Sequence, residues 1–286
     1  MTTWGQLLAE ARERLREPAH PSFEAEELLA RATGFPRHHF HGRRREEASF
    51  AEALRFRELV ARRAAGEPLQ YLLGEWEFLG RTFAVDPRAL IPRGETEAIV
   101  EMARAAAPEA RSILDAGTGS GILAVTLALE RPGARLFALD RSLAALALAR
   151  HNARRLGVAA RVQLLASDWL TGLGARYPRF DLAVSNPPYV PLADLPHLDK
   201  TVSEHEPPLA LFGGPDGLDP LRALLVQLAP LLVAGAPFVF EIGYGQAREV
   251  SRLVDASRAF ALEDIRLDTA GIPRTVLARR VLRPTA

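Results

Sequence analysis

The stretch RSILDAGTGSGILAV, residues 111–125, decides the fold. A short apolar run at 112–115 is followed at once by glycines at 117, 119 and 121 and then by a second apolar run. This pattern is typical of a buried strand that turns sharply into a helix, and glycine lets the backbone come close to a ligand. Because open α/β sheets bind ligands at the carboxyl ends of their strands, we expect a binding site at Gly117 to Gly121.

Strands and helices alternate beyond this stretch. We expect strands at 112–115, 135–140, 162–166, 181–185 and 237–241, with helices near 120–130, 142–157, 217–230 and 245–257. Continuous apolar strands separated by helices indicate an α/β fold with a parallel sheet covered on both faces. The last two runs, 262–267 and 275–279, are joined by a link too short for a crossover helix, so they should pair antiparallel at one end of the sheet.

The first 72 residues are expected to form a small helical bundle. Thr3 and Gln6 make a capping box ahead of the first helix. Two further apolar stripes follow, one of Ala25, Leu28, Leu29 and Ala32, the other of Phe50, Leu54, Ala61 and Ala65. The period then changes in EWEFLGRTFAVDPR, which predicts a β-hairpin within 73–88 that connects the bundle to an α/β domain at 89–286.

Composition excludes several classes of function. The 286 residues include no cysteine, so disulfides, thiolate metal sites and a cysteine nucleophile are ruled out, and we expect no metal at His38, His39 and His41. The net charge is +1, and residues 1–70 hold 12 Arg against 11 Glu, which argues against a nucleic-acid partner. No apolar run is long enough to cross a membrane, so we expect a cytoplasmic protein with no membrane partner.

Acidic residues follow the second and third strands. Asp140 ends RLFALD, where a carboxylate can accept both hydroxyls of a ribose, and SDWL supplies Asp168 and Trp169, which suit an adenine. Each feature has a plainer alternative, a helix-start charge beside Ser142 or a tryptophan that caps a strand. A glycine loop, an acid placed to bind a ribose and a pocket suited to an adenine follow one another in this order along the chain. Together they indicate an adenosine-containing ligand. A dinucleotide fingerprint would need glycine at position 122, which is Ile.

The segment SNPPYV, residues 185–190, follows the fourth strand. A residue before proline is restricted to extended conformations, so the carbonyls of Asn186 and Pro187 should point in fixed directions. This acceptor pair, covered by the flat face of Tyr189, would hold a planar NH2 group. Such a nitrogen has a delocalised lone pair, so methyl transfer to it requires alignment and stabilisation of the growing positive charge rather than a strong base.

The motifs DAGTGSG, Asp140, SDW and NPPY resemble a class I S-adenosylmethionine-dependent methyltransferase. A wider set of motifs more narrowly resembles the protein-(glutamine-N5) methyltransferases of bacterial release factors, the PrmC or HemK family. These motifs are IPRGETE (91–97), GEPLQYLLGEWEF (66–78), EPPLALFGGPDGLD (206–219) and EIGYGQ (241–246). The resemblance implies a seven-stranded sheet with an antiparallel last strand after a helical domain that docks the release factor.

The same resemblance implies roles for individual residues. The methionine part of S-adenosylmethionine would be held by Gly117, Thr118, Gly119, Ser120 and Gly121, the ribose by Asp140, and the adenine by Asp168 and Trp169. The glutamine amide of a Gly-Gly-Gln motif would be bound by the catalytic segment Asn186, Pro187, Pro188 and Tyr189, with Asn186 also beside the cofactor.

Three other functions are less compatible with these motifs. An adenine-N6 methyltransferase of DNA or RNA would use the same NPPY loop, but it normally carries a basic recognition region. A noncatalytic adaptor would need neither an intact glycine loop nor NPPY, and a dehydrogenase lacks the glycine at 122. Because methyl transfer from a sulfonium needs no acid or base, we expect Glu204, His205 and Glu206 to be loop residues, with a part in shaping the pocket as the lesser alternative. We expect EIGYG to serve packing and a helix cap.

Overall fold

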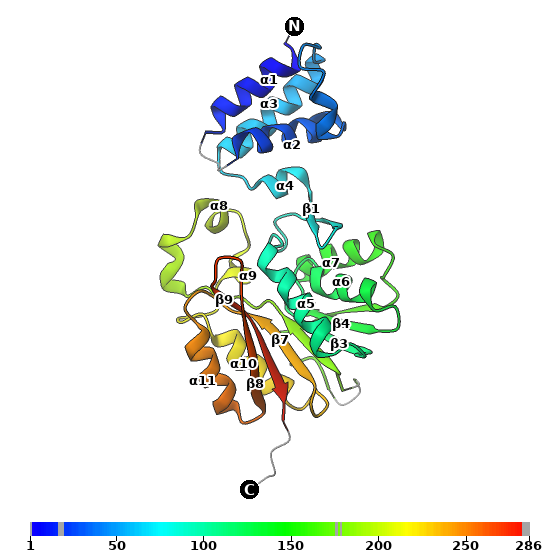
Figure 1. The fold of residues 1–286 in the computed structure, drawn as a ribbon, viewed down its shortest axis with the longest axis vertical. Helices are drawn as coiled ribbons and strands as arrows, with labels where there is room; N and C mark the ends of the chain where they lie inside the picture. The colour runs from blue at the N-terminus through cyan, green and yellow to red at the C-terminus, as the bar shows by residue number, and fades with distance from the viewer. Residues whose placement is uncertain (1, 17–19, 175–176, 178, 282–286) are drawn as a thin grey trace. The chain divides into compact units, whose positions relative to one another are not determined.

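The computed structural model describes residues 2–16, 20–174, 177 and 179–281 (Figure 1). The chain divides into two compact units, one of Met1–Trp76 with Asp199–His205 and one of Glu77–Leu198 with Glu206–Ala286. No helix in the described ranges is both long enough and apolar enough to cross a membrane.

The first unit is helical. Its elements are α1 (Trp4–Arg14), α2 (Pro21–Thr33), the 3-10 helix η1 (Arg37–Phe40), α3 (Phe50–Ala64), α4 (Leu69–Leu73) and α8 (Lys200–Ser203). The expected capping box is present at the start of α1, where Thr3 and Gln6 exchange side-chain and backbone hydrogen bonds. The core of the unit is formed by α1 to α4 and η1, with Leu7, Leu28 and Phe56 fully buried.

The expected apolar stripe on α3 is wrong, although the helix itself is correct. Phe50 is 85% exposed and Leu54 is 57% exposed, whereas Phe56 and Val60 are buried. Residues 53, 56 and 60 have the spacing of one helix face, and residues 50, 54 and 61 have the spacing of another. Helical spacing alone therefore does not decide which of the two faces is buried. Packing against α1 and α2 selects the face that carries Phe56.

A two-stranded sheet follows, made of β1 (Glu75–Phe78) and β2 (Arg81–Ala84). Both residues of its turn have positive φ, 46° at Leu79 and 71° at Gly80. Such a turn matches the right-handed twist of the strands, which explains a hairpin at Leu79–Gly80.

A seven-stranded sheet forms the centre of the second unit, in the order β5-β4-β3-β6-β7-β9-β8. The strands are β3 (Ser112–Ala116), β4 (Arg135–Asp140), β5 (Val162–Ala166), β6 (Leu182–Ser185), β7 (Pro237–Glu241), β8 (Phe260–Leu267) and β9 (Pro273–Arg280). Neighbours from β5 to β7 are parallel, and β9 lies antiparallel between β7 and β8. The predicted fold class, with its antiparallel last strand, is confirmed.

Helices cover both faces of this sheet (Figure 1). One face packs on α5 (Glu97–Ala106), α6 (Ile122–Glu130) and α7 (Leu143–Arg155), and the other on α10 (Asp219–Leu228) and α11 (Ala247–Ser257). Along β4 the side chains alternate, with Leu136 and Ala138 on the first face and Phe137 and Leu139 on the second. Burial of both faces explains why these strands read as continuous apolar runs.

Shorter elements complete the second unit. They are η2 (Gly94–Thr96), η3 (Leu192–His197) and α9 (Pro208–Leu211). No helix was expected from the sequence at 97–106, where α5 begins directly after η2 and buries Ile99, Val100 and Met102 against the sheet.

Candidate active site

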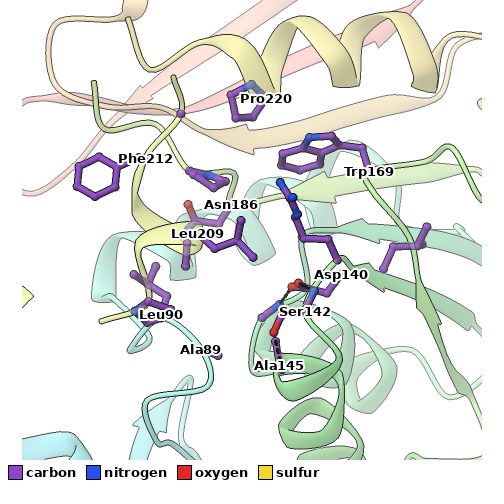
Figure 2. Close-up of a pocket in the computed structure, with 18 of the residues that line it drawn as sticks. Ala89, Leu90, Asp140, Ser142, Ala145, Trp169, Asn186, Leu209, Phe212 and Pro220 are labelled. Carbon is purple, nitrogen blue, oxygen red and sulfur yellow. Dashed lines mark hydrogen bonds between the residues drawn. The ribbon is translucent and has the colours of Figure 1, made fainter. Parts of the chain in front are cut away.

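A cavity of about 430 Å³ lies at the carboxyl ends of the parallel strands. The loop after β3 supplies Gly117 and Gly119, β4 ends in Asp140, and the segments after β5 and β6 supply Trp169 and Asn186. In the view of Figure 2, Asp140 and Trp169 lie on one side of the cavity, with Asn186, Leu209 and Phe212 on the other. Successive strands of the sheet therefore deliver residues of the three motifs to one place.

Asp140 is held rigidly by the backbone. Its Oδ2 accepts a hydrogen bond from the N–H of Gly119 at 2.9 Å, and its Oδ1 accepts from the N–H of Ser142 at 2.8 Å. Burial raises the pKa of this carboxyl, and the two N–H groups oppose that shift. Each carboxylate oxygen has a further lone pair, so Asp140 can still accept hydrogen bonds from a ligand.

The glycine loop is fixed from beneath by a second acid. Asp115, with 0% exposure, accepts hydrogen bonds from Thr118 Oγ1 at 2.6 Å and from the Ala124 N–H at 3.2 Å. Burial raises its pKa to about 7. Gly121 adopts φ +84°, and a Cβ there would lie 3.0 Å from the Cβ of Ala149 on α7. The loop therefore needs glycine at 121 both for its conformation and for the close approach of α7.

Trp169 forms one wall of the cavity. Its φ of 49° is uncommon for a residue with a bulky side chain. The next N–H, that of Leu170, donates to Gln227 Oε1 at 2.8 Å, which helps to hold this turn. The indole ring lies 3.5 Å from the position that a Cβ of Gly117 would take. Asp168, by contrast, is exposed and is not among the residues that line the cavity.

Asn186 is tied to residues far away in the sequence. Its Nδ2 donates to Thr96 Oγ1 at 3.0 Å, and Thr96 Oγ1 in turn donates to Glu241 Oε2 at 2.8 Å. The hydroxyl of Tyr189 donates to the other oxygen, Glu241 Oε1, at 3.0 Å. Burial raises the pKa of Glu241 and also that of Tyr189, whose phenol lies beside this carboxylate. Glu241 therefore connects both ends of the NPPY segment.

The backbone of the NPPY segment is held by the glycines at 213 and 217. A side chain on Gly217 would collide with the carbonyl of Tyr189, and one on Gly213 with the carbonyl of Pro188. The Tyr189 carbonyl also accepts from Gln246 Nε2 at 2.9 Å, while Gln246 Oε1 accepts from the Gly243 N–H at 2.8 Å. The expected helix-cap role for the EIGYG segment is wrong, because Glu241 and Gln246 instead fix the NPPY segment and α11 has no side-chain cap.

A buried acid also connects two loops that border the cavity. Glu206, 3% exposed, accepts from the Ile91 N–H at 3.0 Å and from the guanidinium of Arg93. Glu206 lies in a loop, as expected, but it also supports the cavity, because its carboxylate joins the IPR segment to the segment of α9, and both contribute walls of the cavity through Leu90 and Leu209.

Comparison with known proteins places this geometry in a family. Residues 6–74 match the PrmC N-terminal domain, and residues 95–196 match the methyltransferase small domain. A release factor glutamine methyltransferase from Moorella thermoacetica is 46% identical over 282 residues, covering 97% of this chain and 99% of its own. One from Burkholderia pseudomallei is 43% identical, covering 96% and 97%.

The chain belongs to the release factor glutamine methyltransferase family. The resemblance drawn from its motifs is confirmed, and the chain is a methyltransferase.

Solved structures share the fold of this family at low identity. A methyltransferase from Pyrococcus furiosus has a TM-score of 0.53 at 16% identity, covering 72% of this chain and 91% of its own. The hMettl16 catalytic domain, in complex with the MAT2A 3'UTR hairpin 6, has a TM-score of 0.57 at 14% identity, covering 80% and 84%.

Not every residue that the family resemblance suggested lies in the cavity. Among the described residues, its lining includes Gly117, Gly119, Asp140, Trp169, Asn186 and Pro188. The lining does not include Thr118, Ser120, Gly121, Asp168, Pro187 and Tyr189. Thr118 and Tyr189 instead direct their hydroxyls at the buried acids Asp115 and Glu241.

Four polar residues support the site in ways that were not expected from the sequence. Thr96, Glu206, Glu241 and Gln246 all lie within motifs that carried the family resemblance. One signal in the sequence could have identified Glu241: it is an acid at the end of the apolar strand PFVFE, which the fold must bury. A buried acid needs hydrogen-bond partners, so its position indicates a structural or functional role. Asn152 was missed as well: its side chain, with 0% exposure, bonds the backbone of Ala84 on β2 and the carbonyl of Ser120 in the glycine loop.

Proposed function

We propose that this enzyme transfers a methyl group from S-adenosylmethionine to the side-chain amide nitrogen of the glutamine in the Gly-Gly-Gln motif of bacterial class 1 release factors. The observation that carries the proposal is the presence of Asn186 and Pro188 in the same cavity as Asp140 and Trp169. The relatives, which match nearly the full chain, are release factor glutamine methyltransferases, and this supports the same substrate.

The residues of the cavity fit S-adenosylmethionine. Asp140 has spare acceptor capacity for ribose hydroxyls, since a carboxylate offers about four lone-pair sites and the backbone N–H groups of Gly119, Ser142 and Arg141 do not fill them. The bare backbone of Gly117 and Gly119 allows close approach of the methionine part, and the flat indole of Trp169 suits an adenine. The family resemblance also assigned Asp168 to the adenine. Because Asp168 is exposed and does not line the cavity, Trp169 is the better supported of the two adenine-binding residues.

The protein's own part in the reaction is to bind and align the amide. When bound, S-adenosylmethionine supplies an electrophilic methyl group. The nitrogen of a carboxamide is weakly nucleophilic because its lone pair is delocalised, and positive charge grows on it as the new bond forms. Asn186 Oδ1 would hold the NH2 group and stabilise that charge, while apolar groups such as Leu209 and Phe212 limit access of water. The family resemblance adds the Pro187 carbonyl as a second acceptor, but Pro187 is not among the residues that line the cavity, so Asn186 is the better supported of the two.

We infer that the helical unit, residues 1–72, docks the release factor. Phe50 and Leu54 lie one helical turn apart on α3, and both side chains are exposed. Large apolar side chains that share an exposed helix face are typical of protein-binding surfaces.

The test of the proposed function is a competition assay with labelled cofactor. Release factor, tRNA, rRNA and DNA are offered together, and we expect the label on the release factor glutamine. Asn186→Ala should reduce transfer at least about 100-fold while cofactor affinity stays within a few-fold. Gln163→Ala removes an exposed carboxamide on β5 outside the cavity and serves as the matched control. Label on nucleic acid without label on protein would overturn the proposal in favour of an adenine-N6 methyltransferase.

A further inference from the structure

A buried carboxylate lies behind the NPPY segment. Glu241 ends β7 with 2% of its surface exposed, and each of its oxygens has one hydroxyl partner, Tyr189 at 3.0 Å and Thr96 at 2.8 Å. Burial of an ionised carboxylate is costly unless hydrogen bonds replace its water, and these two hydroxyls provide them. Burial raises the pKa of Glu241, and the two hydroxyls and the guanidinium of Arg274 oppose that shift.

The carboxylate sets the direction of the hydrogen bonds that follow it. Both oxygens of Glu241 accept hydrogen bonds, Oε1 from Tyr189 and Oε2 from Thr96, so the single hydroxyl proton of Thr96 is committed to Glu241. The oxygen of Thr96 can then only accept a hydrogen bond from its other neighbour. That neighbour is the carboxamide of Asn186 at 3.0 Å, which must therefore present its NH2 end to Thr96.

We propose that Glu241 and Thr96 are positioning residues that fix the orientation of the Asn186 carboxamide, so that Oδ1 rather than NH2 serves the substrate. The inference rests on the proposed function and deepens it. Rotation of a carboxamide by about 180° exchanges its oxygen and its NH2 group with little change in shape. The reversed orientation of Asn186 would offer a hydrogen-bond donor to the substrate. With Oδ1 available, the site favours a substrate NH2 group and repels a carboxylate, which selects glutamine over glutamate.

Matched threonine variants test this relay through activity. Thr96→Val keeps the shape of the side chain and removes the hydroxyl, so kcat/KM for the release factor should fall about 30-fold or more, with cofactor affinity changed less than about 2-fold. Thr96→Ser restores the hydroxyl and should stay within about 3-fold of wild type. Thr126→Val is the control, because Thr126 on α6 is fully buried and its hydroxyl has no hydrogen-bond partner among the described residues. It should leave kcat/KM unchanged.

Nuclear magnetic resonance provides a readout that does not depend on turnover. The side-chain NH2 signals of Asn186 are assigned by their loss in Asn186→Ala. In wild type one amide proton is bonded to Thr96 and should exchange slowly with water. Thr96→Val should abolish that protection, whereas Thr96→Ser and Thr126→Val should keep it.

The two readouts separate the possible failures. If wild type methylates release factor and Thr96→Val matches Thr126→Val in both readouts, the relay is overturned and the proposed function stands. If the amide protons respond to Thr96→Val but wild type does not label release factor, the orientation of Asn186 is upheld and the proposed substrate is wrong.

Discussion

Asp140 gives the site its strongest fixed acceptor. Because Gly119 and Ser142 donate to opposite oxygens, the carboxylate is oriented before any ligand arrives. Preorganisation of this kind reduces the entropy that binding would otherwise lose.

Replacing Asp140 by Asn should therefore weaken cofactor binding by roughly 1.5 to 3 kcal/mol, which is about 10- to 100-fold in Kd, since hydrogen bonds to a charged acceptor are lost. Isothermal titration calorimetry with S-adenosylmethionine measures the change. Asp264→Asn removes an exposed carboxylate on β8 and should bind like wild type. Equal affinity of the Asp140 variant and this control would remove Asp140 from the cofactor site.

Asp115 should make stability depend on pH. Its folded pKa, about 7, lies above the roughly 3.9 of an unfolded Asp, so its stabilising contribution is complete below about pH 4 and is lost as pH rises through 7. Between pH 5 and pH 8, wild type should lose roughly 2 to 3 kcal/mol of unfolding free energy relative to Asp115→Asn. Urea unfolding at both pH values tests this, and a difference that stays constant with pH would contradict it. Asp264→Asn again serves as the control.

At the scale of the element, the start of α6 depends on its contact with α7. Gly121 and Gly157 both have positive φ, 84° and 74°, but a Cβ at 121 would press on Ala149 whereas one at 157 would meet nothing within 4 Å. The pair therefore separates backbone strain from steric overlap.

Gly157→Ala should cost about 1 kcal/mol through backbone strain alone, and Gly121→Ala about 2 to 4 kcal/mol, because α7 must also move. Unfolding midpoints in urea measure the difference. Cofactor affinity should fall in the Gly121 variant only, since that loop borders the cavity. Similar stability of the two variants would show that α7 yields easily to the added methyl group.

For the molecule as a whole, the proposed division of labour assigns chemistry to one unit and docking to the other. The double variant Phe50→Ser, Leu54→Ser should raise KM for intact release factor about 10-fold or more, because apolar contact area is lost, while S-adenosylmethionine affinity stays unchanged. Steady-state kinetics with a full-length release factor measure KM.

Val226→Ser is the matched control for this double variant, because Val226 is an exposed apolar residue on α10 of the other unit. Its KM should equal that of wild type. If the double variant also keeps the wild-type KM, α3 has no part in docking.

Local periodicity determined most of the fold. Strands at 135–140, 162–166 and 237–241 were predicted with their bounds from short apolar runs. In β4 and β7 these runs are continuous because the residues are buried on both faces, whereas β5 lies at the edge of the sheet and is only partly buried. The order of motifs also predicted that Gly117, Asp140, Trp169 and Asn186 would meet, since parallel strands end at one edge of the sheet. The sequence alone therefore determined the fold class and the place of the site.

Only the tertiary structure decided which side chains orient the site and which helix face is buried. Asn186 bonds Thr96 across 90 residues of sequence, and Thr96 in turn bonds Glu241 across 145. Glu206 reaches Ile91 across 115. On α3, two faces have helical spacing, and packing buried the one with Phe56. The physical reason is the same in each case: periodicity reports that a residue is buried, whereas its partner depends on how distant strands and loops come together.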